Sequence, residues 1–287
     1  FGTKDDCYLT RKLISALYLD LERGKTLDQR ELEIYFQQVA DEKAKKNNSK
    51  KVSDEGVDNK VDYLEIKTQK KLVLAKSSNQ NSFINSMLSK ELVFGIGPAG
   101  TGKTYLAIAV AVSLFSQGLV EKIVLTRPAV EAGERLGFLP GDMKEKVDPY
   151  MQPLYDALND FLPGKVVSKM YERGSIEIAP LAFMRGRTLK DSFIILDEGQ
   201  NASPSQMKMF LTRLGIGSRM VVTGDITQID LPRGFKSGLV EASEVLSKIS
   251  EIDFIKFNDV DIVRHSLVRK IAKAYEINSK QSHNTEK

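Results

Sequence analysis

Residues 97–104 read GPAGTGKT and match G-x-x-x-x-G-K-[ST], the pattern of a phosphate-binding loop. The glycines allow positive φ angles, so successive backbone N–H groups can point at one anion. Lys103 supplies a mobile cation for the β- and γ-phosphates, and the Thr104 hydroxyl is a ligand for Mg²⁺. We therefore expect a nucleoside triphosphate to bind at Gly97, Pro98, Ala99, Gly100, Thr101, Gly102, Lys103, Thr104 and Tyr105.

An acid pair follows a second apolar run. Residues 193–196 read FIIL, and Asp197 and Glu198 come directly after them. Because α/β sheets place ligands at the carboxyl ends of their strands, we expect Asp197 to hold Mg²⁺ and Glu198 to orient and polarise the attacking water. The alternative is a strand that ends in a solvated acidic turn. The upstream phosphate loop favours the catalytic interpretation.

Other polar residues follow apolar runs or precede the loop. Gln228 and Asp225 follow residues 221–223 and are candidates to sense the γ-phosphate, against a plain strand-to-turn junction. Arg127 ends another run and has two interpretations, an anion contact or an ion pair with a carboxylate in the segment that follows. Gln80 can donate and accept at once, which suits an adenine edge, although an exposed polar loop also explains it.

Short β-rich runs recur with helical segments between several of them, at 92–97, 122–127, 176–179, 193–196, 220–223 and 252–257. This alternation predicts an α/β fold with a mostly parallel sheet and helices on both faces. Ser203-Pro204-Ser205-Gln206 is a capping box with proline at the first helical position. Residues 129–175 are rich in charge, glycine and proline, and we expect an inserted lid or arm there.

Composition limits the alternatives. The chain has 287 residues, 41% of them apolar, a net charge of +4 and one cysteine, so a disulfide framework is excluded and a reducing compartment is expected. The longest apolar stretch is too short and too interrupted to span a membrane. The first residue is Phe1 rather than Met, which is consistent with a longer natural chain, and it opens no signal-peptide pattern.

We divide the chain into three parts. Residues 1–69 form a helical N-terminal region and a charged linker, residues 70–275 an ATPase domain, and residues 276–287 a polar tail. About half of the residues in 41–60 are charged, which is typical of a solvated linker or a disordered loop. An exposed helix with paired charges remains an alternative for residues 41–47.

Six blocks together resemble the PhoH-like proteins, the phosphate-starvation-inducible ATPase family. These blocks occupy residues 95–109, 124–158, 176–189, 193–201, 207–215 and 221–232. The resemblance covers about residues 70–275, and GERLGFLPGD at 133–142 is its most specific part. It implies a P-loop NTPase fold of the RecA-like type, related to the first motor domain of superfamily-1 helicases. By this likeness, Gln80 falls where helicases carry an adenine-reading glutamine.

The resemblance also implies a function. It indicates a cytoplasmic protein that binds and hydrolyses ATP with Mg²⁺, acts in RNA metabolism, and has RNA and a metal-dependent endoribonuclease as partners. We expect either an RNA-remodelling motor or, as the alternative, an ATP-dependent switch or scaffold that recruits a nuclease. A small-molecule kinase is a weaker third class, since nothing beyond the acid pair suggests an acceptor pocket.

Helicases of this superfamily complete the ATP site with an arginine from a second motor domain, and this chain resembles only the first. We therefore expect a homo-oligomer, a ring such as a hexamer, in which a neighbour supplies that arginine. The candidates are Arg185, Arg187, Arg213 and Arg264, and we favour Arg264. Each of them could instead be an exposed salt-bridge partner.

Overall fold

The structure is a computed structural model that describes residues 14, 63–128, 143–232, 234–263, 267–268 and 271, with backbone alone for 143–148. Several of the sequence-based predictions lie outside these residues. They concern the helices and linker before residue 63, the block at 133–142, Arg264 and the polar tail.

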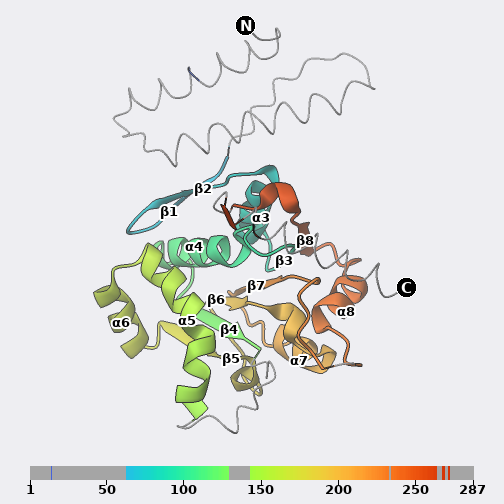
Figure 1. Cartoon of the computed structure of the whole chain (residues 1–287). Coiled ribbons are helices and arrows are strands. Elements are labelled where there is room, and N and C mark those ends of the chain that lie inside the picture. Colours follow the sequence, from blue (N-terminus) through green and yellow to red (C-terminus); the bar gives the residue numbers. More distant parts are fainter. Residues whose placement is uncertain are drawn as a thin grey trace, which may run out of the picture.

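A six-stranded parallel sheet forms the centre of the molecule (Figure 1), in the order β5-β4-β6-β7-β3-β8. Its strands are β3 (Leu92–Ile96), β4 (Lys122–Arg127), β5 (Ile176–Pro180), β6 (Ser192–Leu196), β7 (Arg219–Gly224) and β8 (Ile252–Lys256). The predicted α/β class and all six predicted strands are confirmed, with bounds that differ by two residues at most.

Alternate residues of each buried strand face opposite sides of the sheet, and two cores result. Val93, Ile123 and Ile195 pack into one core, whereas Phe94 and Ile194 pack into the other. The strands read as continuous apolar runs because helices cover both sides, which is the usual state of a parallel sheet.

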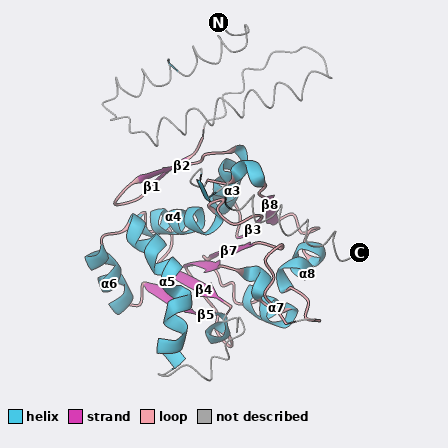
Figure 2. Cartoon of the chain, in the orientation of Figure 1, coloured by secondary structure: helices cyan, strands magenta, loops and turns pink. Residues whose placement is uncertain are grey.

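The helices divide between the two faces (Figure 2). The first core is covered by α3 (Ser78–Ser89), α4 (Lys103–Ser116), α5 (Met143–Phe161) and α6 (Gly164–Glu172), and the second by α7 (Pro204–Leu211) and α8 (Gly238–Val245). The capping box predicted at Ser203 is present at the start of α7. The described part of the chain also contains three 3₁₀ turns, η2 (Leu181–Met184), η3 (Gly199–Asn201) and η4 (Asp259–Asp261).

An antiparallel hairpin precedes the sheet. It consists of β1 (Glu65–Lys67) and β2 (Leu72–Leu74), and Ile66 and Val73 are buried in the same core as α4. Strand β1 therefore lies on the N-terminal side of the boundary at residue 70 that we expect from composition.

The expectation of a lid or arm at 129–175 is wrong for its described part. Helices α5 and α6 connect two adjacent parallel strands, β4 and β5, as an ordinary crossover. Met151, Leu154, Leu158 and Phe161 have helical spacing and are fully or almost fully buried. The charged residues between Met151 and Phe161 are Asp156 and Asp160, and both are exposed.

Strand β3 ends at a glycine that tolerates no side chain. Gly97 has a φ of +155°, and a Cβ added there would lie 2.5 Å from the carbonyl oxygen of Phe257. We expect Gly97→Ala to lower the free energy of unfolding by about 2–3 kcal/mol, because the backbone of Phe257 must shift. Thermal or urea unfolding measures this effect.

Gly164→Ala is the matched control for that substitution. Gly164 lies at the start of α6, and nothing lies within 4 Å of a Cβ built there. We expect this variant to match the wild type or exceed it slightly, since alanine narrows the unfolded ensemble. Equal stability of Gly97→Ala and Gly164→Ala would contradict the close approach at Gly97.

Candidate nucleotide-binding site

The phosphate loop joins β3 to α4 at the carboxyl end of the sheet. Gly100 and Gly102 have φ angles of +83° and +82°, so both use the left-handed region that favours glycine. The Lys103 ammonium donates to the carbonyl oxygens of Gly97 and Pro98 at 2.6 and 2.7 Å. Lys103 therefore crosses the loop that would surround the phosphates, and these contacts must yield to a bound triphosphate.

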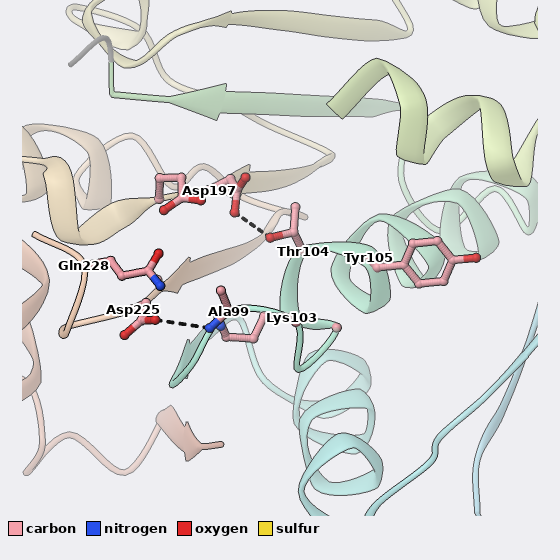
Figure 3. Close-up of a pocket in the computed structure, with 11 residues that line it drawn as sticks. Ala99, Lys103, Thr104, Tyr105, Asp197, Asp225 and Gln228 are labelled. Atoms are coloured by element: carbon pink, nitrogen blue, oxygen red, sulfur yellow. Dashed lines mark hydrogen bonds between the residues drawn. The ribbon is translucent and has the colours of Figure 1, made fainter. Parts of the chain in front are cut away.

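Three oxygen-bearing side chains converge beside the loop, and Figure 3 shows two of them, Thr104 and Asp197. The Thr104 hydroxyl donates to Asp197 Oδ1 at 2.5 Å, and Thr223 Oγ1 donates to the same oxygen at 2.8 Å. Mg²⁺ prefers hard oxygen ligands, so a hydroxyl and a buried carboxylate beside a triphosphate fit this ion. The structure thus brings together Thr104 and Asp197, the two residues that the sequence predicts for Mg²⁺.

The acid pair does not lie on a strand next to β3. Strand β6 carries Asp197 at its carboxyl end, and β7 lies between β6 and β3. Thr223 of β7 fills this gap because its hydroxyl contacts both Thr104 and Asp197. Sequence reasoning missed Thr223, although its place at the end of an apolar strand is the same signal that identified Asp197.

Glu198 occupies a strained backbone position. Its φ and ψ of 53° and 38° lie in the left-handed region, which is unfavourable for a residue with a side chain. Its carboxylate is 41% exposed and reaches the cavity. Oε1 accepts from Arg127 at 3.1 Å, and Oε2 accepts from Gln200 at 2.6 Å.

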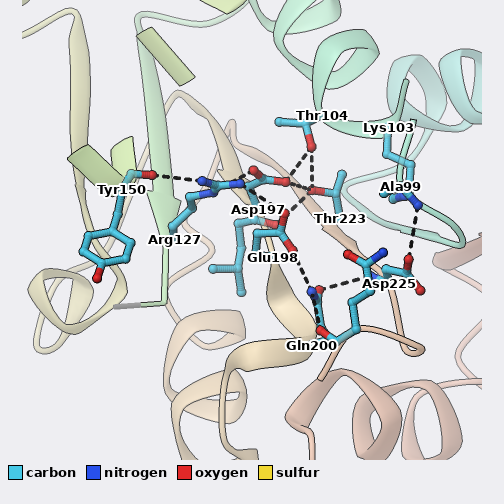
Figure 4. A network of polar contacts seen from close by, with 12 residues as sticks. Ala99, Lys103, Thr104, Arg127, Tyr150, Asp197, Glu198, Gln200, Thr223 and Asp225 are labelled. Atoms are coloured by element: carbon cyan, nitrogen blue, oxygen red, sulfur yellow. Dashed lines mark hydrogen bonds and ion pairs between the residues drawn. The ribbon is translucent and has the colours of Figure 1, made fainter. Parts of the chain in front are cut away.

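Arg127 pairs with the acid pair itself (Figure 4). Its Nε donates to Asp197 Oδ2 at 2.9 Å, and its Nη1 donates to the carbonyl oxygen of Tyr150 in α5 at 2.9 Å. The ion-pair interpretation of Arg127 needs correction, because its described partners are Asp197, Glu198 and a backbone carbonyl rather than a carboxylate of the following segment. A contact of Arg127 with an anionic ligand stays a prediction.

Gln200 and Asp225 hold the loops around the acid pair. Gln200 is buried, and its amide oxygen accepts from the Asp225 backbone N–H at 3.0 Å. One carboxylate oxygen of Asp225 accepts from the backbone N–H of Ala99 in the phosphate loop at 3.1 Å, and the other from Thr227. Asp225 thus orders the phosphate loop, while Gln200, which sequence reasoning missed, links the ends of β6 and β7.

A cavity of about 260 Å³ opens at this place. Ten predicted site residues line it, and Gly224 completes its lining; the ten are Ala99, Gly100, Gly102, Lys103, Thr104, Tyr105, Asp197, Glu198, Asp225 and Gln228. Sites that enclose a whole small molecule span about 300–1,000 Å³. This cavity is smaller, so it suits the phosphate end of a nucleotide better than the complete nucleotide. The side chain of Gln228 extends toward this cavity from the loop after β7 (Figure 3).

Gln80 lies behind the phosphate loop. Its amide nitrogen donates to the Thr101 carbonyl at 3.0 Å, and its amide oxygen accepts from the Lys76 N–H at 2.7 Å. Gln80 is 3% exposed and does not line the cavity, nor do Gly97, Pro98 and Thr101. An adenine contact by Gln80 stays a prediction, and the described role of its side chain is to support the loop.

Tyr105 points away from the carboxylates (Figure 3). Its hydroxyl accepts from Lys71 Nζ at 3.0 Å and lies 3.3 Å from Asp160 Oδ2, and its ring packs on Phe161. The hydrogen bond from Lys71 lowers the pKa of Asp160. Tyr105 therefore joins the turn of the hairpin to the end of α5 at the rim of the cavity.

Two of the candidate arginines are engaged within the chain. Arg187 bonds both oxygens of Glu177, at 2.5 and 2.8 Å, and this lowers the pKa of Glu177 to about 2. Arg213 donates to backbone carbonyls, including that of Arg187 at 2.8 Å. Arg185 follows η2 and is exposed. Arg264, the preferred candidate, lies outside the described residues.

The described residues contain neither a membrane-spanning helix nor a cluster of metal-ligating side chains. None of the helices in this part of the chain has the length and apolarity that a membrane crossing requires. No group of three or more His, Cys, Asp or Glu side chains in it could hold a metal ion. The arrangement of Thr104 and Asp197 differs from such a site because most ligands of a nucleotide-bound Mg²⁺ come from phosphate and water.

The parallel sheet, with a phosphate loop after one strand and an acid pair after another, defines the class of P-loop NTPase domains. A family model described as PhoH-like protein matches residues 72–276, and the chain therefore belongs to the PhoH-like protein family. This confirms the resemblance of the six sequence blocks.

Curated relatives support the same assignment. The chain is 60% identical over 206 residues to a PhoH-like protein of Bacillus subtilis, 57% over 205 residues to one of Mycobacterium tuberculosis, and 43% over 205 residues to Protein PhoH of Escherichia coli. These matches cover 72%, 71% and 71% of this chain and 65%, 58% and 58% of the relatives. The matched region is thus less than two thirds of each relative.

Solved structures show weaker likeness. Pif1 helicase from Candida albicans aligns with a TM-score of 0.35 and 17% identity, covering 64% of this chain and 39% of that one. The UvsW helicase from Bacteriophage T4 aligns with a TM-score of 0.39 and 11% identity, covering 68% of this chain and 64% of that one.

Proposed function

We propose that this protein hydrolyses ATP with Mg²⁺ and acts in RNA metabolism as a helicase-like or RNA-remodelling ATPase of the cytoplasm. The observation that carries the ATPase proposal is the convergence of Thr104 and Asp197 at 2.5 Å beside the phosphate loop, with Glu198 next in the chain. The RNA part of the proposal derives from the motifs shared with superfamily-1 helicases.

In this proposal different residues bind the phosphates, hold the metal ion and activate the water. Backbone N–H groups of the loop and Lys103 bind the β- and γ-phosphates, and Thr104 and Asp197 hold Mg²⁺. The ion, when bound, neutralises charge on the phosphates. Glu198 orients a water and accepts its proton as the water oxygen attacks the γ-phosphorus. The bond from that phosphorus to the β–γ bridging oxygen breaks, and ADP and phosphate leave.

A second candidate function is an ATP-dependent switch or scaffold that recruits an endoribonuclease. The contacts of Glu198 favour it, because both carboxylate oxygens are already engaged by Arg127 and Gln200. Such a site would bind ATP tightly but hydrolyse it slowly. Slow basal hydrolysis is therefore expected in either case, and the response to RNA distinguishes the two.

We further propose that protomers assemble, in a ring such as a hexamer, and that a neighbour's arginine completes the site. Among the described candidates, Arg187 and Arg213 are held by internal contacts, whereas Arg185 is exposed directly after η2, the turn that follows the edge strand β5. This position supports Arg185 as a residue that acts on a neighbour. Arg264 remains the other candidate.

The test is the ATPase rate with and without single-stranded RNA at several salt concentrations, alongside the molecular mass. For the motor, we expect RNA to raise the rate several-fold, with an effect that weakens steeply as salt rises, because phosphate contacts release counterions. An unchanged rate together with ATP-gated nuclease binding would favour the switch. A monomer whose activity is independent of protein concentration would exclude the shared site.

A further inference from the structure

The guanidinium of Arg127 joins three segments of the chain that meet at the acid pair (Figure 4). Its Nε contacts Asp197, its Nη2 contacts Glu198 and its Nη1 contacts the carbonyl oxygen of Tyr150, at 2.9, 3.1 and 2.9 Å. Each nitrogen therefore has a different partner. The Arg127 and Asp197 side chains are 17% and 6% exposed, so solvent screens the ion pair between them weakly, whereas the Glu198 side chain is 41% exposed.

These contacts oppose the role assigned to Glu198. A carboxylate that accepts a proton from water needs an oxygen that the water can reach. Arg127 contacts Oε1 of Glu198 at 3.1 Å, and Gln200 contacts Oε2 at 2.6 Å. Both carboxylate oxygens therefore have a protein donor beside them, and a water must compete with these donors.

We propose that Arg127 is a positioning residue that restrains Glu198 in the nucleotide-free protein, and that α5 sets the strength of this restraint through the Tyr150 carbonyl. Hydrolysis then requires the bond between Arg127 and Glu198 to open. This inference rests on the proposed ATPase function and adds a form of regulation to the same site.

Helix α5 is built to bend at the point where Arg127 contacts it. Pro149 and Pro153 lie inside the helix. Pro153 has no N–H to bond the carbonyl of Pro149, and its ring crowds that carbonyl, so this turn is weakened. Tyr150 lies in the same turn. Its carbonyl oxygen has two lone pairs, so it can accept a hydrogen bond from Arg127 in addition to a bond within the helix. A displacement of this turn therefore reaches Glu198 through one side chain.

The main test is Arg127→Gln in the full chain. We expect kcat for ATP to rise about three- to tenfold without RNA, with a change in KM of less than about threefold. Loss of a purely structural contact would not raise kcat. The kcat of Arg127→Lys should lie between those of the wild type and Arg127→Gln. A lysine ammonium cannot contact three separate partners as the planar guanidinium does.

Arg219→Gln is the matched control, since Arg219 Nη1 contacts only backbone carbonyls, of Met87 and Lys90, at 3.4 and 3.1 Å. We expect its kcat to equal that of the wild type. A second readout is amide hydrogen exchange in α5, which should quicken around residues 150–154 in Arg127→Gln and stay unchanged in the control. A folded Arg127→Gln protein that binds ATP with an equal or lower kcat would overturn the restraint.

Pro153→Ala tests the role of α5 with a substitution outside the acid pair and its contacts. It also tests the restraint if Arg127→Gln does not fold. Pro153 is exposed, and alanine restores the missing helix N–H, which straightens the turn and draws Tyr150 away from Arg127. We expect a smaller rise in kcat than in Arg127→Gln, and no further rise when the two are combined. A kcat no higher than the wild type's, or an equal rise in the Arg127→Gln background, would overturn the coupling through α5.

The experiments distinguish a failure of the proposed ATPase function from a failure of the proposed restraint by Arg127. A wild-type protein without ATPase activity would remove the proposed function and the restraint together. An active wild type with no faster Arg127→Gln variant would remove the restraint alone.

Discussion

Lys103→Ala is expected to weaken ATP binding at least about 100-fold, which corresponds to about 3 kcal/mol. The ammonium already lies across the phosphate loop, 2.6 Å from the Gly97 carbonyl, and in the proposed function it is the charged donor for the β- and γ-phosphates. Titration with a fluorescent ATP analogue measures the affinity. The rise in melting temperature that ATP produces should also disappear, because only ligand bound to the folded state stabilises it.

Lys169→Ala provides a control of the same charge change. Lys169 lies exposed on α6, among residues that do not line the cavity. We expect its affinity for the ATP analogue to equal that of the wild type. Tight binding by Lys103→Ala would show that the triphosphate binds elsewhere, and the assignment of the loop would then be wrong.

Glu198→Gln is expected to separate binding from turnover. The amide has nearly the shape of the carboxylate but cannot accept a proton from water, so we expect kcat to fall about 10²- to 10⁴-fold. ATP affinity should change by less than about threefold, since Lys103 and the loop amides remain. A single-turnover assay beside an equilibrium binding measurement checks both expectations.

The matched control for this variant is Glu172→Gln, an exposed glutamate in the last turn of α6. It should hydrolyse ATP at the wild-type rate. Normal turnover in Glu198→Gln would refute the role of Glu198 and would leave Asp225 and Gln228, which also line the cavity, as the candidates predicted from the sequence.

Much of the fold could be predicted because its signals are local. Buried strands such as residues 193–196 are continuous apolar runs, and a polar residue or glycine follows β3, β6 and β7 at the sheet's carboxyl edge. The capping box at Ser203 required only four adjacent residues. The lid expected at 129–175 was wrong because composition shows the exposed charges of α5 and conceals its stripe of Met151, Leu154 and Leu158.

The network around the acid pair could not be predicted in the same way. Arg127 lies 70 residues before Asp197 in the sequence, and only the pairing of β4 with β6 makes them neighbours. Gln80 has a polar sequence context, yet it is buried behind the loop, because α3 packs against α4 and aims its amide at Thr101. Neither contact leaves a periodic or local signature in the chain.

The sequence by itself determined the chemistry available to this protein: a phosphate loop that carries a hydroxyl, and an acid pair, each after an apolar strand. Such motifs are readable because the residue types act over a few adjacent positions. Only the tertiary structure decided that β7 separates the loop from the acid pair, that Thr223 bridges them and that Arg127 binds Glu198. Strand order and side-chain direction result from packing the whole sheet between two cores, and no short stretch of sequence specifies that packing.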